Sequence, residues 1–150
     1  MEKEYRYTAS GLENVILVGL AECVDDEGET CVTIPHINQL HKAIATGIVM
    51  RNGGMSGGEL RFLRTMMGMT QAELAKAVNR DAQTVGRWER QEFENDPNAE
   101  ALIRLIAMDR LALDLDAPVE EVTGWCVQTA EAQPIRIDAS NPNDYKLLAA

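Results

Sequence analysis

The N-terminal third of the chain combines short β-rich runs with one helical stripe. Residues 13–24 (ENVILVGLAECV) and 29–35 (ETCVTIP) are rich in β-branched and apolar residues, and an acidic, turn-forming stretch separates them. This pattern predicts two strands of a hairpin or small sheet. A helix is expected to begin at Pro35, because apolar residues recur with the spacing of one helix face at Ile37, Leu40, Ile44 and Ile48.

A glycine-rich loop, RNGGMSGG (residues 51–58), precedes a segment in which the pattern is helical throughout. The first helix of this segment starts at Ser56, and Gly68 ends it. Thr70 is expected to cap the second helix, with Glu73 three residues later completing a capping box.

A short turn at Asn79 and Arg80 leads to a third helix that Asp81 is expected to cap. Val85 and Trp88 point inward from this helix. A fourth helix starts at Pro97, and its apolar face is expected to comprise Leu102, Leu105, Ile106, Met108, Leu111 and Leu113.

The signal weakens after Leu113. The runs EVTGWCVQT and PIRID are candidate short strands, and SNPND is a turn. We therefore expect a mainly α, α+β protein with three parts: an N-terminal β-plus-helix unit (1–51), a helical domain (56–113) and an acidic C-terminal extension (114–150).

Two helices joined by a turn of three to four residues can place the second helix in a DNA major groove. The segment 56–113 resembles the DNA-binding domain of phage repressors and of the Xre-type helix-turn-helix family. The residues that carry this resemblance are LR at 63–64, GMTQ at 68–71, ELA at 73–75 and T-V-x-x-W-E at 84–89. The resemblance implies a lambda-repressor-like helical bundle.

The resemblance also assigns roles to individual residues. Gln71, at a helix N-terminus, is expected to touch a phosphate. Gln83 and Arg87, on the outward face of the third helix, can pair with adenine and guanine, and Ala82 can meet a thymine methyl group. The further phosphate contacts are assigned to Arg80, Thr84 and Arg90, and a structural pair between the first and third helices to Arg64 and Glu89.

The charge distribution refines this picture. The chain has 14 basic and 24 acidic residues, a net charge of −10. Residues 1–55 carry −4, residues 56–92 carry +1 and residues 93–150 carry −7. Charges more than about 10 Å apart are largely screened at physiological salt, so an acidic body is compatible with DNA binding. It should lower affinity for DNA of any sequence, and the pattern favours reading a site over coating DNA.

Other chemistry finds little support. The spacing C-x7-C-x4-H-x4-H, from Cys23 to His41, lacks the close cysteine pair of a zinc knuckle, so neither a metal nor another cofactor is expected. No phosphate loop, nucleophile–base pair or carboxylate dyad argues for an enzyme. Cys23, Cys31 and Cys126 are expected to be free thiols, and the absence of a signal peptide and of membrane-length apolar runs indicates a cytoplasmic protein without a membrane contact.

The N-terminal unit gives a second resemblance. Its position before the DNA-binding domain is similar to the layout of MqsA-type antitoxins, on the residues YTASGLENVIL and LHKAI together with Gln83 and Arg87. The paired CxxC zinc ligands of that family are absent here. The resemblance implies an autoregulating repressor that also holds a basic toxin. Two alternatives stay open, a phage or mobile-element repressor without a toxin and a protein-interaction adaptor that no longer binds DNA.

One recognition helix reads about four to five base pairs, too few to select one operator in a genome. We therefore expect a homodimer that binds double-stranded DNA at a palindromic operator. Its interface is expected on the apolar fourth helix or on the flanking segments.

Overall fold

The chain divides into two compact units, each described here by itself. The computed structural model describes residues 3–51, 53–113, 119–126 and 134–148. One unit comprises residues 1–44 and 133–150, and the other comprises residues 45–132. This division differs from the three segments expected from the sequence, because part of the acidic C-terminal segment completes a sheet with the N-terminal strands.

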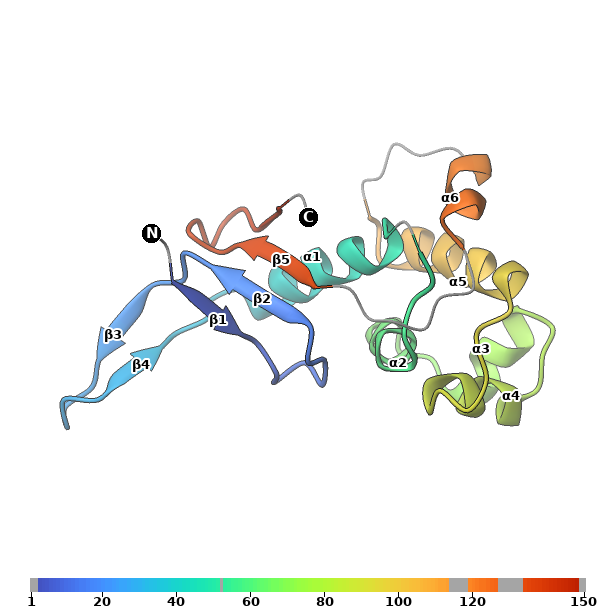
Figure 1. Cartoon of the computed structure of the whole chain (residues 1–150), viewed down its shortest axis with the longest axis horizontal. Helices are drawn as coiled ribbons and strands as arrows, with labels where there is room; N and C mark the ends of the chain where they lie inside the picture. Colours follow the sequence, from blue (N-terminus) through green and yellow to red (C-terminus); the bar gives the residue numbers. More distant parts are fainter. Residues whose placement is uncertain (1–2, 52, 114–118, 127–133, 149–150) are drawn as a thin grey trace. The chain divides into compact units, whose positions relative to one another are not determined.

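The first unit is built on a four-stranded sheet in the order β1–β2–β5–β6 (Figure 1). The central strands β2 and β5 run parallel, with Val15 opposite Ile135, and the two outer pairs are antiparallel. The strand expected in the run PIRID is thus confirmed. The bounds are Glu4–Arg6 for β1, Val15–Val18 for β2, Ile135–Asp138 for β5 and Lys146–Leu147 for β6.

The core of this unit lies between the sheet and the first half of α1 (Ile37–Val49). Leu17 and Ile137 from the sheet and Leu40 and Ile44 from the helix are fully buried, as the helical stripe predicts. The helix starts two residues later than expected, at Ile37, since His36 has a φ of 55° and cannot continue a right-handed helix backwards.

A separate hairpin is formed by β3 (Glu22–Val24) and β4 (Thr30–Val32) (Figure 1). Cys23 lies directly opposite Cys31 in its register, with 5.2 Å between their Cα atoms, and a disulfide joins them. The expectation of free thiols is therefore wrong for these two cysteines, because it rested on their number and not on strand register. The third cysteine, Cys126, is free and buried, and burial raises the pKa of its thiol to about 11.

The second unit is helical, so the expected α+β class is confirmed. The run EVTGWCVQT (residues 121–129) was a candidate strand, but residues 121–125 belong to helix α6 (Val119–Trp125), in which Val122 is buried; residues 127–129 lie outside the described residues. A short apolar run does not separate a strand from a buried helix by its periodicity. The helices that follow α1 are α2 (Gly57–Met66), α3 (Gln71–Ala77), α4 (Ala82–Glu89), α5 (Pro97–Arg110) and α6 (Val119–Trp125).

Helix α5 begins at Pro97 as expected, but it buries a different face. Ile103 and Ala107 are fully buried, whereas Leu102 is 42% exposed. The remaining residues of the expected apolar face are half-buried, except Leu113, which is buried. The expected face named neither Ile103 nor Ala107, the two residues of this helix that are buried most completely among its apolar side chains.

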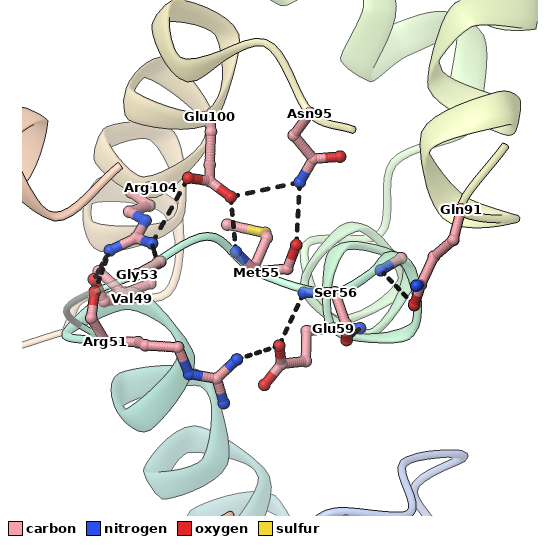
Figure 2. A network of polar contacts seen from close by, with 11 residues as sticks. Val49, Arg51, Gly53, Met55, Ser56, Glu59, Gln91, Asn95, Glu100 and Arg104 are labelled. Atoms are coloured by element: carbon pink, nitrogen blue, oxygen red, sulfur yellow. Dashed lines mark hydrogen bonds and ion pairs between the residues drawn. The ribbon is translucent and has the colours of Figure 1, made fainter. Parts of the chain in front are cut away.

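A buried polar network holds the glycine-rich loop between α1 and α2 (Figure 2). The guanidinium of Arg104, which is fully buried, donates to the carbonyl oxygens of Val49, Arg51 and Gly53 and lies 3.5 Å from the Glu100 carboxylate. A buried charge is tolerated when it is paired and hydrogen-bonded in this way. The loop is therefore a fixed part of the helical unit.

The carboxylate of Glu100 extends the network toward α4. It accepts hydrogen bonds from the Met55 backbone N–H at 2.7 Å and from the Asn95 amide at 3.2 Å (Figure 2). The carboxylate of Glu59, also buried, pairs with Arg51 and accepts from the Ser56 N–H at 2.8 Å. Together these contacts set the position at which α2 starts.

Candidate nucleic-acid interface

Helices α3 and α4 form a helix-turn-helix whose boundaries match the sequence prediction. The Thr70 hydroxyl accepts from the Glu73 N–H at 3.1 Å, and the Glu73 carboxylate accepts from the Thr70 N–H at 3.1 Å, so the capping box is confirmed. Asn79 has a φ of 58°, the left-handed conformation that asparagine tolerates, and Asp81 caps α4. The four residues between the helices thus turn the chain as the motif requires.

Helix α4 has one buried and one outward face. Val85 is fully buried and Trp88 is 4% exposed, so the inward orientation expected for both is confirmed. Gln83 is exposed, and Ala82 and Arg87 are partly exposed. The side chains assigned to base edges are therefore available on the side of the helix that the core does not use.

The orientation of α4 is fixed by polar contacts as well as by packing. The Arg64 guanidinium on α2 binds both carboxylate oxygens of Glu89 and also donates to the Met69 carbonyl oxygen at 3.0 Å. The Gln71 side-chain amide, at the start of α3, donates to Glu89 at 3.2 Å. Glu89 thus ties α4 to both preceding helices, and the structural pair expected between Arg64 and Glu89 is confirmed.

Two glycines mark close contacts around α4. A Cβ on Gly57 would lie 2.3 Å from the Glu89 carbonyl oxygen and 2.6 Å from that of Trp88, so only glycine fits where α2 meets the end of α4. A Cβ on Gly86 would lie 3.1 Å from the Arg90 guanidinium and 3.4 Å from the Gln71 side-chain oxygen. Gly86 is therefore covered by two side chains that were assigned to phosphates.

Thr84, a residue assigned to phosphate, has its hydroxyl engaged within the protein. Its hydroxyl donates to the Asp81 carboxylate at 2.8 Å, and its backbone N–H donates to the same oxygen at 2.7 Å. The pKa of Asp81 is lowered by these two hydrogen bonds, the backbone one first, and further by the charge of Arg87. Asp81 thus places one negative charge at the start of the recognition helix.

The arginines around α4 have partners that the sequence reading missed. Arg90 pairs with Glu92 at 3.2 Å, Arg80 pairs with Asp96, and the Arg87 guanidinium lies 5.6 Å from the centre of the Phe93 ring. Arg90 lowers the pKa of Glu92, mainly through their hydrogen bond, and the charge of Arg87 lowers it further. The available signal was the run ERQEFEND, which has one basic and four acidic residues and lies close to these arginines in the sequence. It does not say which partner each arginine takes.

Other kinds of site find no counterpart in the part of the chain that the structure describes. No group of three or more histidine, cysteine, aspartate or glutamate residues within those ranges is arranged to hold a metal ion. His41, the second histidine of the C-x7-C-x4-H-x4-H spacing, instead has its Nε2 atom 2.9 Å from the Tyr7 hydroxyl. Within the same residues, no helix is both long and apolar enough to cross a membrane.

Comparison with known families supports the reading of α3 and α4. A family model described as helix-turn-helix matches residues 60–114, which run from within α2 past the end of α5. No curated protein and no solved structure matches the chain. The matched family is one of DNA-binding regulatory domains and not of enzymes. The chain therefore carries a helix-turn-helix domain, and this domain supports a role as a DNA-binding transcriptional regulator.

Proposed function

We propose that the protein is a sequence-specific repressor that binds the promoter region of its own operon through α4. The observation that carries this proposal is the division of α4 into two faces. Trp88 and Val85 anchor it to the core, while Gln83 and Arg87 lie on the outward side, at the positions where a recognition helix meets base edges. A helix with this arrangement inside a matched helix-turn-helix segment is suited to the major groove.

The outward side chains suit direct reading of bases. The amide of Gln83 can pair bidentately with adenine and the guanidinium of Arg87 with guanine, while Ala82 can contact a thymine methyl group. The phosphate contacts fall to residues on α4, next to its ends and at the start of α3. These are Gln71, Arg80, Thr84 and Arg90, each of which already has a polar partner within the protein.

The site requires two copies of the chain. One α4 helix covers about four to five base pairs, and a two-fold dimer doubles the sequence that is read, as a palindrome with half-sites ~34 Å apart or a multiple of it. The exposed Leu102 and its half-buried apolar neighbours on α5 offer one surface for the dimer. The segments flanking the helical domain offer another.

An antitoxin role is the second candidate, and a feature of the hairpin favours it. Residues 21–30 are exposed throughout, and they include five acidic and no basic side chains. Such a surface complements a basic partner protein. A small neighbouring open reading frame that encodes a basic protein would separate an antitoxin from a phage or mobile-element repressor. Both roles place the protein in the cytoplasm.

Selection of genomic DNA by the pure protein tests the proposal. Fragments retained by the protein are sequenced, and a gel shift follows with the promoter upstream of its gene. We expect one palindromic sequence to be enriched and that promoter to be shifted. Retention of no DNA, or retention without sequence preference, would contradict the repressor proposal and favour the adaptor alternative.

A further inference from the structure

The loop that follows α4, residues 91–96, contacts three arginines, of which Arg87 lies on α4 and the other two lie next to its ends. We propose that this loop tunes DNA binding: its carboxylates compete with phosphates for two arginines, while its aromatic ring holds the base-reading arginine without neutralising it. The inference rests on the proposed DNA binding by α4. The three contacts are Glu92 with Arg90, Asp96 with Arg80, and Phe93 with Arg87.

The pair between Arg90 and Glu92 is open to solvent. The two side chains are 57% and 51% exposed, and the guanidinium Nε and carboxylate Oε1 are 3.2 Å apart. Exposed pairs of this kind are weak, so a phosphate can replace the carboxylate. The replacement is still unfavourable in part, because the released carboxylate then lies beside a DNA backbone of the same charge.

The pair between Arg80 and Asp96 has a second anchor. The Asp96 carboxylate also accepts from the Asn98 N–H at 3.2 Å, which caps α5. The cap keeps this carboxylate in place when Arg80 moves toward a phosphate. Asparagine caps helices about as well as aspartate, so Asp96→Asn removes the charge of the carboxylate with little change to the cap.

The contact of Arg87 is of a different chemical kind. Its guanidinium faces an aromatic ring that is 58% exposed, and Arg87 makes no ion pair within the described part of the chain. A cation over an aromatic face is held in orientation but keeps its charge. Phe93 is thus a positioning residue, and the side chain proposed to read guanine remains ready to donate to it.

The division of partners gives the loop two separable effects. Phosphate contacts form on any DNA sequence, so carboxylates opposite them weaken binding to operator and random DNA alike. The base contact forms only on the operator, so orienting Arg87 strengthens operator binding alone. The net charge of −10, which includes these carboxylates, acts in the same direction on DNA of any sequence.

Affinities for two duplexes test the carboxylate part. The probes are a labelled duplex taken from the enriched genomic fragments and a random-sequence duplex of equal length, measured by fluorescence anisotropy at one salt concentration. Glu92→Gln and Asp96→Asn should each tighten binding to both duplexes by roughly two- to five-fold, the range of an exposed ion pair. The matched control is Glu94→Gln, an equal charge change in the same loop at a residue without an ion pair among the described residues. If it tightens binding as much as the other two, general charge and not pairing is responsible, and the inference falls.

Substitutions of Phe93 test the positioning part. Phe93→Leu should weaken binding to the operator duplex several-fold and leave the random duplex unchanged, while Phe93→Tyr should restore operator binding because the ring is kept. Equal loss on both duplexes, or no loss, would overturn this role. If the wild-type protein binds neither duplex, the proposed function itself is contradicted. If the wild-type protein binds the operator duplex but the variants do not show the expected changes in affinity, only the role of the loop is contradicted.

Discussion

Arg64 on α2 and Glu89 at the end of α4 form a two-pronged ion pair. The guanidinium Nε lies 2.6 Å from Oε2, and Nη2 lies 3.1 Å from Oε1. The side chains are 15% and 5% exposed, so solvent screens the pair little. A charge pair so enclosed is costly to break, because the remaining partner stays buried without its counter-charge. The orientation of the recognition helix therefore depends on this pair.

Glu89→Ala should lower the free energy of unfolding by about 3–5 kcal/mol, since it leaves Arg64 and the Gln71 amide without their acceptor. Urea unfolding followed by circular dichroism measures the change. The control is Glu92→Ala, whose pair is about half exposed and should contribute less than about 1 kcal/mol. Equal losses in the two variants would mean that the Arg64–Glu89 pair is not a structural tie.

Replacing two glycines near α4 by alanine should have different effects on the stability of the protein. Gly57→Ala should destabilise the protein by about 1–3 kcal/mol or more, because its Cβ would meet the Glu89 carbonyl oxygen at 2.3 Å and backbone must move. Gly86→Ala should leave stability unchanged or raise it by up to about 1 kcal/mol, because alanine favours the helix and the nearest atom is the flexible end of Arg90. Thermal melting of both variants checks this. A stable Gly57→Ala protein would contradict the close packing of α2 on α4.

The features that the sequence predicted well are those with local causes. The caps and the turn of the helix-turn-helix each depend on residues no more than three positions apart. They are the capping box of Thr70 with Glu73, the turn at Asn79 and the cap at Asp81. The inward face of α4 follows from helical spacing for the same reason. These local signals were sufficient to predict which face of α4 is turned away from the core, whereas the roles given to its side chains came from the family resemblance.

The features that the sequence did not predict depend on contacts between distant segments. The pairing of β2 with β5 joins residues 15–18 to 135–138, and no local pattern encodes that register. The burial of Arg104 depends on carbonyl oxygens near Val49, more than fifty residues earlier. The contact of Arg87 with Phe93 follows from the path of a loop. In each case the partner is set by the tertiary structure and not by spacing.

Reduction should release the β3–β4 hairpin and convert its disulfide into two thiols. The hairpin has three residue pairs, and residues 21–30 are exposed, so little besides the disulfide holds a two-stranded ribbon together. A dithiol reductant exchanges with the Cys23–Cys31 bond to give two thiols and its own disulfide. Hydrogen exchange in residues 22–32 should then accelerate, while exchange in α2 to α5 stays unchanged.

The same reduced protein should show a difference among its thiols. Iodoacetamide at pH 8 should label Cys23 and Cys31 and leave Cys126 unmodified, because Cys126 is buried and its pKa is about 11, so that little thiolate is present. Mass spectrometry of the labelled peptides measures this, with Cys126→Ser as the matched control. Labelling of Cys126 at the rate of the other two would contradict its buried position. In the exchange experiment on the reduced protein, unchanged hydrogen exchange in residues 22–32 would show that contacts other than the disulfide hold the hairpin.

One substitution can test which surface forms the interface of the proposed dimer. Light scattering at micromolar concentration should give twice the chain mass of 16.6 kDa. Leu102→Glu should yield monomers if α5 forms the interface, because it places charge on a side chain that is 42% exposed in the single chain. A Leu102→Glu protein that remains dimeric would assign the interface to the flanking segments. A strictly monomeric wild-type protein that occupies DNA one chain per site would refute the dimer and the palindrome together.

Replacement of Arg87 and of Arg80 by alanine should weaken DNA binding in two different ways. Arg87→Ala should cost ~1–3 kcal/mol of operator binding and relax the preference for one G·C pair in each half-site, because the side chain is proposed to read guanine. Its stability should hardly change, since the contact that it loses is with an exposed ring. Arg80→Ala should weaken binding to all sequences alike and reduce the salt dependence by about one counterion. Titrations of operator and random duplexes at several salt concentrations separate the two outcomes. If Arg87→Ala loses the same affinity on both duplexes, Arg87 contacts only phosphate and the base-reading face of α4 has been assigned incorrectly.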